Sequence, residues 1–300
     1  MKKQNKAFSL IELSIVVLVI GILIAGVIQG SRMLVDSRLK SARALTRSSP
    51  VAGIKDLALW LETTSAESFL SSQAENGTQL TLWNDINPQV RNPFFARKTA
   101  SASAKYVENS PVGGLPAVYL DGAVSGQFLL STSSSSAVAT PVPTQNDFTF
   151  FVVSRTDFSK TGTDAYIMDN GVEGSNGFSY SINPISRQKN ITVQRSSLFD
   201  ITTIFAATPI TPEVVSYTYA GGTLGAHKIY SNGVNYALNN PKVTYTQPTT
   251  RFLIGARATN WQTWSGWLSE IIIFNRYLND VDRKSVEKYL AQKYGIKITQ

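Results

Sequence analysis

The sequence predicts a long N-terminal transmembrane helix followed by an all-β sandwich that closes with one helix. Three observations lead to this fold class. Residues 13–28 are apolar and carry no charge, the chain after Pro50 breaks into short apolar segments separated by turn residues, and residues 280–294 are amphipathic with capping residues at both ends. These patterns are typical of a membrane span, of short β-strands and of an α-helix, respectively.

The first element is the N-terminal helix. Glu12 is the only charged residue within residues 7–31, and no proline occurs before Pro50, so nothing interrupts a helix here. At about 1.5 Å per residue, residues 8–28 reach about 30 Å, which is the thickness of the hydrocarbon layer of a bilayer. We therefore predict a transmembrane segment over about residues 8–28.

Glu12 is the unusual residue of this segment. A carboxylate at the centre of a bilayer costs at least about 2.5 kcal/mol, and ionisable residues inside membranes are functional by default. This predicts a positively charged partner for Glu12. The alternative is that Glu12 lies near the cytoplasmic interface, where headgroups and water lower the cost without a partner.

The helix is expected to continue out of the membrane as an amphipathic segment, residues 29–47. Apolar residues such as Leu39 and Leu45 alternate there with basic and polar ones, as on a helix with one buried face. Pro50 ends the helix, because the residue before a proline is pushed out of the helical conformation. We place the domain boundary here, with the β domain at residues 50–300. The basic face contacts solvent, anionic headgroups or neighbouring acidic surfaces, and the sequence does not choose between them.

The β domain is predicted from short runs rich in β-branched and aromatic residues, which indicate a sandwich or barrel. The candidate strands are residues 57–61, 80–83, 117–120, 148–154, 165–168, 178–182, 214–219, 228–231, 252–255 and 267–274. Asn232 and Gly233 lie between apolar residues, which is a strong signal for a β-hairpin turn.

The last element is a helix at the C-terminal end. Asn279 can cap its first turn, Asp280 and Asp282 suit the positive end of its dipole, and Gly295 can end it. The predicted buried stripe consists of Val281, Val286, Tyr289, Leu290 and Tyr294.

The positive charge is concentrated in the N-terminal region. Of the net charge of +8, residues 1–49 contribute +6, which gives the β domain no marked basic face and argues against nucleic-acid binding. The lysines before the apolar run predict a cytoplasmic N-terminus and a β domain outside the cytoplasm. A cleaved secretory signal is the competing interpretation, but its apolar region is usually shorter. The chain has no cysteine, so the domain is held together without disulfides.

A short basic leader ends at Ala7 and is followed by Phe8-Ser9-Leu10-Ile11-Glu12-Leu13. This segment resembles the N-terminus of type IV pilins and type II secretion pseudopilins, and the resemblance covers about residues 1–47. It implies that a prepilin peptidase cleaves between Ala7 and Phe8, removes a leader of residues 1–7 and methylates the amine of Phe8. Two features depart from the family: alanine replaces the more usual glycine at Ala7, and the apolar run lacks the late proline of many pilins.

The resemblance also implies a partner for Glu12. In this family the carboxylate pairs with the free N-terminal amine of a neighbouring subunit, here that of Phe8. Two opposite charges in an apolar filament core attract strongly, and either one alone would be costly. Phe8 and Glu12 are therefore the expected assembly residues.

An ordered set of motifs in the β domain includes Leu82-Trp83-Asn84-Asp85, Ala117-Val118-Tyr119-Leu120-Asp121-Gly122, Ile229-Tyr230-Ser231-Asn232-Gly233 and the strand at residues 267–274. The set resembles a concanavalin A-like lectin/glucanase domain of the laminin G type over about residues 55–297. It implies a jelly-roll sandwich of two antiparallel sheets.

Enzymatic activity is not expected from the β domain. Glucanases of the same superfamily use an E-x-D-x-x-E pattern that is absent from residues 50–300, and retaining hydrolysis needs two carboxyl groups about 5 Å apart. Glu270 stands alone in its strand and is expected to be a buried acid satisfied by an arginine, such as Arg276, or by backbone donors. His227 is the only histidine, which argues against zinc sites and Ser-His triads, and we expect it to be exposed or half-buried.

Candidate ligand-binding residues lie in turns. Asp121, Asp164 and Asp169, with Asn170, could supply oxygen ligands to a calcium ion, although acidic turn residues are common without a metal. Laminin G-type domains often bind calcium or glycans at one rim. Trp261 lies in a polar loop and is the candidate for an exposed contact with a sugar. Trp267 is expected to pack in the core. No other cofactor is predicted.

The function expected from these features is that of a pilin-like subunit, a minor pilin or pseudopilin, that displays its β domain for adhesion or glycan recognition. Its expected partners are the prepilin peptidase, other pilin subunits, the inner membrane, and a surface glycan or protein. It would span the bacterial inner membrane once, with the β domain in the periplasm, before entering an extracellular filament. The alternatives are a periplasmic lectin anchored by the helix and an anchored glycoside hydrolase, the latter less favoured.

Overall fold

The protein is described by a computed structural model. It describes residues 10–90, 95–98, 104–122, 128–131, 142–159, 165–171, 176–195, 198–204, 210–221, 227–236, 245, 252–257 and 262–299.

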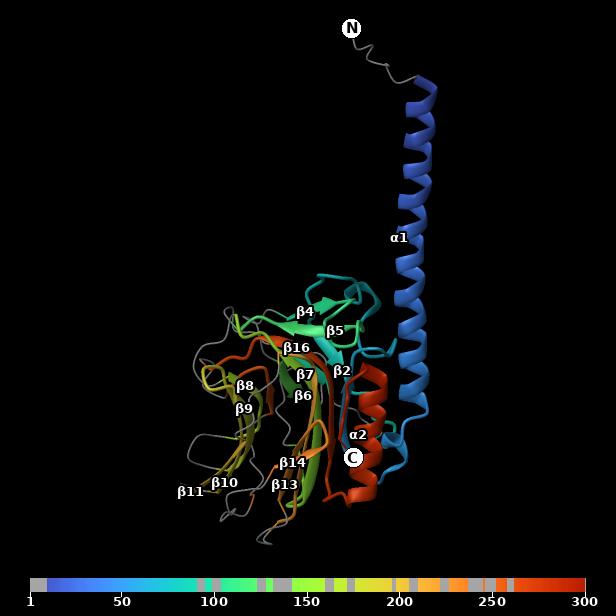
Figure 1. Ribbon diagram of the computed structural model, residues 1–300. Coiled ribbons are helices and arrows are strands. Elements are labelled where there is room, and N and C mark those ends of the chain that lie inside the picture. The colour runs from blue at the N-terminus through green and yellow to red at the C-terminus, as the bar shows by residue number, and fades with distance from the viewer. Residues whose placement is uncertain are drawn as a thin grey trace.

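One long helix, α1 (Leu10–Arg47, 38 residues), carries the chain from its N-terminal end to the β domain. The helix is long and apolar enough to cross a membrane, and none of its most apolar window is buried within the protein. Only its last turns contact the domain, where Ala42 and Thr46 are buried. Figure 1 shows the N-terminal part of α1 projecting far beyond the sandwich. The predicted apolar helix and its end before Pro50 are confirmed.

The β domain is a sandwich of two antiparallel sheets. The first sheet has the order β14-β13-β12-β7-β16-β5-β4. Strand β16 has two further partners at its two ends, since β5 pairs with residues 266–268 and β1 pairs with residues 270–274. Its strands are β1 (Leu57–Glu62), β4 (Ala104–Val107), β5 (Ala117–Leu120), β7 (Phe148–Thr156), β12 (Glu213–Tyr219), β13 (Lys228–Ser231), β14 (Val234–Tyr236) and β16 (Gly266–Phe274).

The second sheet has the order β11-β10-β9-β8-β15-β6-β3-β2. Its strands are β2 (Leu82–Asn84), β3 (Phe95–Lys98), β6 (Phe128–Ser131), β8 (Ala165–Asp169), β9 (Gly177–Asn183), β10 (Gln188–Arg195), β11 (Leu198–Ile204) and β15 (Leu253–Ile254). Two short 3-10 helices, η1 (Val51–Gly53) and η2 (Ser71–Gln73), lie in the connections.

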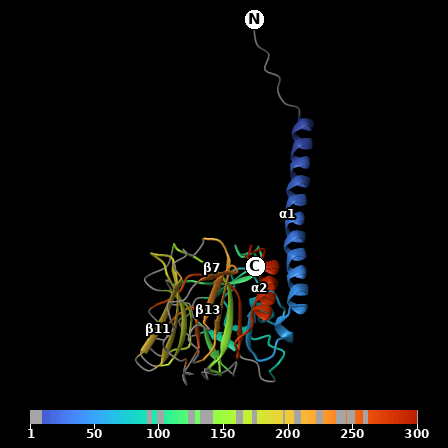
Figure 2. The same cartoon turned by 60° about the horizontal axis from the view of Figure 1, so that its bottom comes forward.

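Four layers follow one another across the molecule. Figure 2 shows the sheet that contains β11, the sheet that contains β7 and β13, the C-terminal helix α2 (Asp280–Tyr294) and then α1. The space between the two sheets holds the main core, in which Trp83, Phe150 and Tyr217 are buried. A second core lies between the first sheet and the helices.

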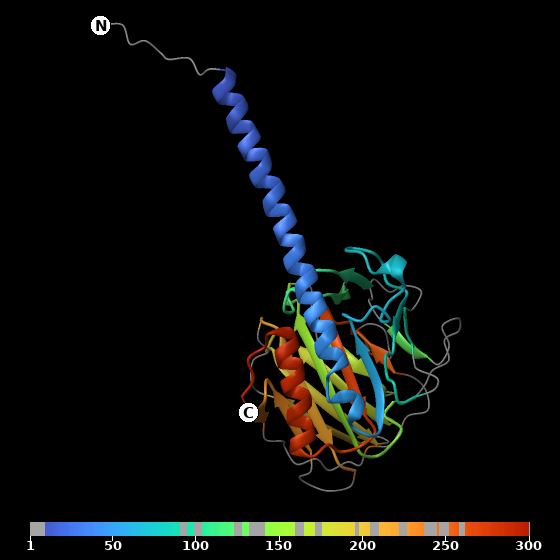
Figure 3. The same ribbon diagram turned by 90° about the vertical axis from the view of Figure 1, so that its right-hand side faces the viewer.

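Helix α2 covers the outer face of the first sheet and runs beside the last turns of α1 (Figure 3). Asn279 caps it by accepting a hydrogen bond from the Asp282 N–H, and Gly295 ends it in the left-handed conformation (φ 65°). Four members of the predicted stripe are buried, but Val281 is 78% exposed. The prediction was wrong for Val281 because the first turn extends past the edge of the second core.

The predicted strands are present in the structure with shifted ends, and the hairpin at Asn232 and Gly233 is confirmed. Both residues have positive φ (50° and 78°), and they join β13 to β14. The sequence patterns did not predict β3, β4, β6, β10, β11 and β14.

Candidate functional site

The assembly segment lies at the start of α1. Glu12 occupies the first turn of the helix and is exposed, as are the apolar residues around it. Ala7 and Phe8, the predicted processing residues, lie outside the described residues. The geometry therefore places Glu12 on a helix surface that the β domain does not cover, and the Ala7/Phe8 cleavage site remains a prediction.

A buried ionic network joins the β domain to both helices. Glu62 on β1 lies opposite Glu270 on β16 in the register of the sheet, and both side chains are fully buried beneath α2. Lys293 of α2 lies between the two carboxylates, with its Nζ 2.8 Å from Glu62 Oε2 and 2.8 Å from Glu270 Oε2. One ammonium group therefore bridges two carboxylates that would otherwise repel each other.

Neutral donors complete the coordination of Glu270. Trp60 Nε1 and the Tyr289 hydroxyl donate to Oε1 at 2.8 and 2.9 Å, and the Tyr294 hydroxyl donates to Oε2 at 2.9 Å. The Tyr289 hydroxyl is also 3.3 Å from Thr46 Oγ1 on α1. The network thus contacts β1, β16, α2 and the last turns of α1.

The electrostatics of the network favour the charged forms of its ion pair. Burial alone would raise the pKa of Glu62, but Lys293 and the N–H and hydroxyl of Thr64 together lower it below its usual value. Burial opposes the charge of Lys293, but Glu270 and Glu62 raise its pKa well above the ordinary value. Burial and the charge of Glu270 raise the pKa of Tyr289 and Tyr294, so both phenols stay protonated and able to donate.

This arrangement corrects the expectation for Glu270. The residue is buried as predicted, but its partners are a lysine, two tyrosines and a tryptophan, and Arg276 is not among them. A second carboxylate, that of Glu62, lies on the neighbouring strand. The two acids have no exposed surface, so the pair serves to fix α2 and α1 to the sheet.

Glu62 and Lys293 were not predicted as members of one network. The available signal was a single glutamate in each of two apolar strands, at the end of β1 and in the middle of β16, because an acid in a buried strand needs a cation. The cation is Lys293, which lies 231 residues after Glu62 in the chain.

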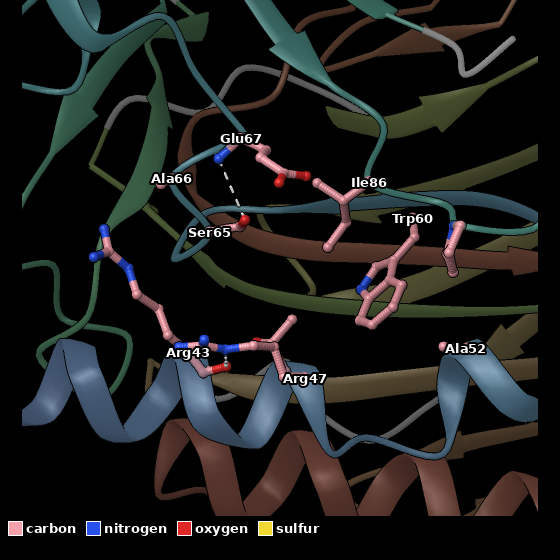
Figure 4. Close-up of a pocket in the computed structure, with 10 residues that line it drawn as sticks. Arg43, Arg47, Ala52, Trp60, Ser65, Ala66, Glu67 and Ile86 are labelled. Carbon is pink, nitrogen blue, oxygen red and sulfur yellow. Dashed lines mark hydrogen bonds between the residues drawn. The ribbon is translucent and has the colours of Figure 1, made fainter. Parts of the chain in front are cut away.

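A groove lies where α1 meets the sandwich (Figure 4). It encloses about 430 Å³ and is lined by Arg43, Thr46, Arg47, Ala52, Trp60, Ser65, Ala66, Glu67, Ile86 and Pro88. Arg43 and Arg47 form the helix wall, and the loop with Glu67 forms the facing wall. Arg43 Nε donates to the Thr64 carbonyl at 2.7 Å, so the groove forms only when α1 is seated on the domain.

Of the predicted calcium and sugar residues, Asp121 and Asp169 lie within the described part of the chain. Asp164 and Trp261 lie outside the described residues. Asp121 is half-buried after β5, whereas Asp169 is buried in β8 and accepts a hydrogen bond from the Gly171 N–H at 3.0 Å. Among the described residues, no three His, Asp or Glu side chains gather as a metal site. A ligand role for Asp121, Asp164, Asp169 and Trp261 remains a prediction.

Trp267 packs against the second core, as a partly buried residue at its edge. It is half-buried on the outer face of the first sheet, with the Tyr119 ring at 5.0 Å and the Arg155 guanidinium over its own ring at 5.0 Å. Trp264 is the fully buried tryptophan of this region.

His227 is buried, not exposed or half-buried as predicted. It is 6% exposed, lies just before β13, and makes an edge contact with the Tyr219 ring at 4.2 Å. Its Nδ1 lies 3.3 Å from the Tyr217 hydroxyl. Burial lowers the pKa of His227 from 6.5 to about 4, so the imidazole is neutral at physiological pH.

His227 should make the domain sensitive to acid. Because its folded-state pKa lies below the value in an unfolded chain, the unfolded state binds the proton first as the pH falls. The free energy of unfolding should therefore fall between pH 6.5 and about 4, by up to about 3 kcal/mol from this residue. Urea titrations in detergent at several pH values would measure it, and His227→Gln should remove this part of the loss. An identical pH profile for the variant would contradict the assignment.

The N-terminal segment matches a family model. Residues 2–28 match the model described as the prokaryotic N-terminal methylation motif. No curated protein matches the chain.

The β domain is similar in fold to several toxin binding domains. The receptor binding domain of botulinum neurotoxin mosaic serotype C/D is 11% identical with a TM-score of 0.54, over 78% of this chain and 50% of that one. The binding domain of botulinum neurotoxin serotype D is 12% identical with a TM-score of 0.54, over 80% and 52%. The binding domain of Paraclostridial Mosquitocidal Protein 1 is 10% identical with a TM-score of 0.53, over 78% and 52%.

This chain spans about half the length of each of these structures. At such low identity the similarity concerns the fold, and it agrees with the two-sheet sandwich expected from the sequence. The chain therefore carries a prepilin-type N-terminal methylation motif, on a helix able to span a membrane, joined to a β-sandwich with the fold of toxin binding domains.

Proposed function

We propose that this protein is a pilin-like filament subunit, a minor pilin or pseudopilin, that displays its β-sandwich for adhesion or glycan recognition. The observation that carries the proposal is the methylation motif over residues 2–28 at the head of a helix whose apolar surface the β domain leaves bare. The motif implies cleavage between Ala7 and Phe8 by a prepilin peptidase.

The exposed part of α1 needs a non-aqueous environment. Its large apolar residues, from Leu10 to Ile28, are between 48% and 84% exposed. Such a continuous apolar surface is unstable in water. Lipid covers it in the inner membrane before assembly, and the helices of neighbouring subunits cover it in a filament. The β domain then lies in the periplasm first and outside the cell afterwards.

The size of the β domain, here called the head, suits a minor or tip-located subunit. The β domain of residues 50–300 is bulky for a tightly packed shaft, and the ionic network around Lys293 fixes it to the last turns of α1. A rigidly held head is displayed in a defined direction.

Recognition of a glycan is the proposed role of the head. One similar structure, the ligand binding domain of botulinum neurotoxin serotype D, is described in complex with N-acetylneuraminic acid. Botulinum neurotoxin type C is described as depending on two ganglioside molecules for cell entry. These proteins share the fold of this chain, and their binding roles support a non-enzymatic, laminin G-like recognition module here.

A strain that lacks the prepilin peptidase tests the proposal. The protein should then accumulate as the full-length precursor in the inner membrane and disappear from filaments sheared off the cell surface. A matched strain with the peptidase restored should return it to the sheared fraction. Equal amounts in the membrane of both strains, with none in either sheared fraction, would instead favour an anchored periplasmic lectin.

A further inference from the structure

A second groove lies at the end of the sandwich where α1 delivers the chain to β1. At this end β7 and β1 begin, while β12 and β16 end, as the pairs Tyr219 with Phe148 and Leu57 with Phe274 show. The groove, here called the polar groove, has a volume of about 690 Å³. It is lined by Asp56, Leu57, Thr144, Gln145, Asn146, Asp147, Gly221, Asn275 and Arg276.

The frame of the polar groove is fixed by hydrogen bonds between its segments. Asn275 Oδ1 accepts from the Thr144 N–H at 2.8 Å, and the Asn275 N–H donates to the Asp56 carbonyl at 2.8 Å. Asp147 Oδ1 accepts from the Gly221 N–H at 2.6 Å. A Cβ at position 221 would lie 3.0 Å from the Cβ of Asn146, so glycine permits this close approach. Four separate chain segments are thereby held in one arrangement.

Several polar groups in the polar groove are left for a ligand. Within the described part of the chain, the carboxylate of Asp56 and the guanidinium of Arg276 make no hydrogen bond or ion pair, and Asp147 uses one carboxylate oxygen. The Asn275 side-chain amide N–H groups also have no protein partner there. The groove therefore presents both acceptors and donors, close together and partly fixed in position.

The chemistry of the lining selects a class of ligand. Two carboxylates and one guanidinium nearly balance, so the groove does not favour a strongly anionic or cationic ligand. Alternating acceptors and donors match the hydroxyl groups of a sugar, each of which donates and accepts. We propose that the polar groove binds a neutral oligosaccharide, with Asp56 and Asp147 accepting from hydroxyl groups and Arg276 and Asn275 donating to them.

The position of the polar groove suits display. Figure 1 shows that this end of the sandwich points away from the N-terminal end of α1. A subunit embedded through α1 would present the groove away from the membrane. This inference rests on the proposed recognition role of the β domain. It needs neither cleavage nor filament assembly, so the glycan site and the filament role can fail separately.

The test uses the full chain, purified in detergent from the inner membrane. It is applied to an immobilised panel of neutral oligosaccharides built from glucose, galactose, mannose and N-acetylhexosamines, with sialylated and sulfated counterparts. The tightest neutral oligosaccharide is then titrated by calorimetry. Asp56→Asn/Asp147→Asn should weaken its binding by at least about tenfold, because each change replaces a charged acceptor with a neutral one.

These substitutions are chosen to leave the fold intact. Asp56 has a positive φ of 65°, which asparagine tolerates, and asparagine at 147 keeps an oxygen for the Gly221 N–H. The control is Glu75→Gln/Glu108→Gln, which also removes two negative charges but from exposed residues outside the polar groove. It should leave binding unchanged. Arg276→Gln is an independent variant that should also weaken binding, and thermal unfolding checks that each variant is folded.

The possible results separate cleanly. Binding to a neutral oligosaccharide that falls in both groove variants and not in the control supports the proposal. Unchanged binding in the groove variants, binding to acidic glycans alone, or no binding across the panel would overturn it. If N-methyl-Phe8 is detected in filaments but no oligosaccharide of the panel binds, the filament role is supported and the proposed glycan site is contradicted.

Discussion

Replacing Lys293 with methionine should destabilise the folded protein by about 3–5 kcal/mol, because it leaves two buried carboxylates without their cation. Lys293 Nζ contacts Glu62 and Glu270 at 2.8 Å each, and all three side chains are buried. The loss should appear in urea titrations followed by tryptophan fluorescence in detergent.

A matched control lies on the same helix. Lys288 of α2 is exposed, and Lys288→Met should change the free energy of unfolding by less than about 0.5 kcal/mol. Neutralising the whole network in Glu62→Gln/Glu270→Gln/Lys293→Met should recover much of the loss, because the network then holds no unpaired charge. A single Lys293→Met variant as stable as the control would contradict the network.

Replacing Glu12 with alanine should remove the protein from filaments. If Glu12 neutralises the N-terminal amine of Phe8 on a neighbouring subunit, the variant leaves that amine unpaired in an apolar core. Breaking a buried pair in this way costs about 3–5 kcal/mol, which is about a hundredfold or more in association. The measurement is the ratio of protein in sheared surface material to protein in the inner membrane.

Asp36→Ala is the control for Glu12→Ala. Asp36 is an exposed acid on the same helix but beyond the apolar run, and its removal should leave incorporation close to that of the unmodified protein. An anchored lectin predicts that both variants behave alike. Normal incorporation of Glu12→Ala would therefore contradict the proposed pairing.

The sequence was most informative where structure depends on local signals. The apolar run of α1 and its end before Pro50 follow from composition and from the conformational restriction that proline imposes. The caps of α2 at Asn279 and Gly295 are likewise local. Long, continuous patterns of this kind need no information about distant residues.

The missed strands show where local signals end. The segment Gln188–Arg195 is mostly polar, yet it forms β10 because β9 and β11 pair with it on both sides. Lys189 within it is buried against Glu213, 2.8 Å away on β12 of the other sheet. Strand formation here depends on pairing between segments, and the alternation rule fails when a strand buries a charged pair.

The sites were harder to predict than the elements that carry them. Lys293, in the last turn of α2, has the pattern of a solvated lysine that favours a helix C-terminus, and nothing nearby indicates that it meets Glu62. The polar groove combines four segments, from Asp56 to Arg276, whose proximity follows only from the sheet topology. Asp169, chosen for its local turn context, lies buried in β8 and accepts a hydrogen bond from the Gly171 N–H, and its ligand role stays a prediction.

The most direct test of the filament role is mass spectrometry of the N-terminal peptide, from both sheared surface material and the inner membrane. A chain that begins with N-methyl-Phe8 in the sheared fraction is the expected result, and it would establish both prepilin processing and assembly. A chain that begins at Met1 or Lys2 and is confined to the inner membrane would contradict the filament role and favour an anchored lectin.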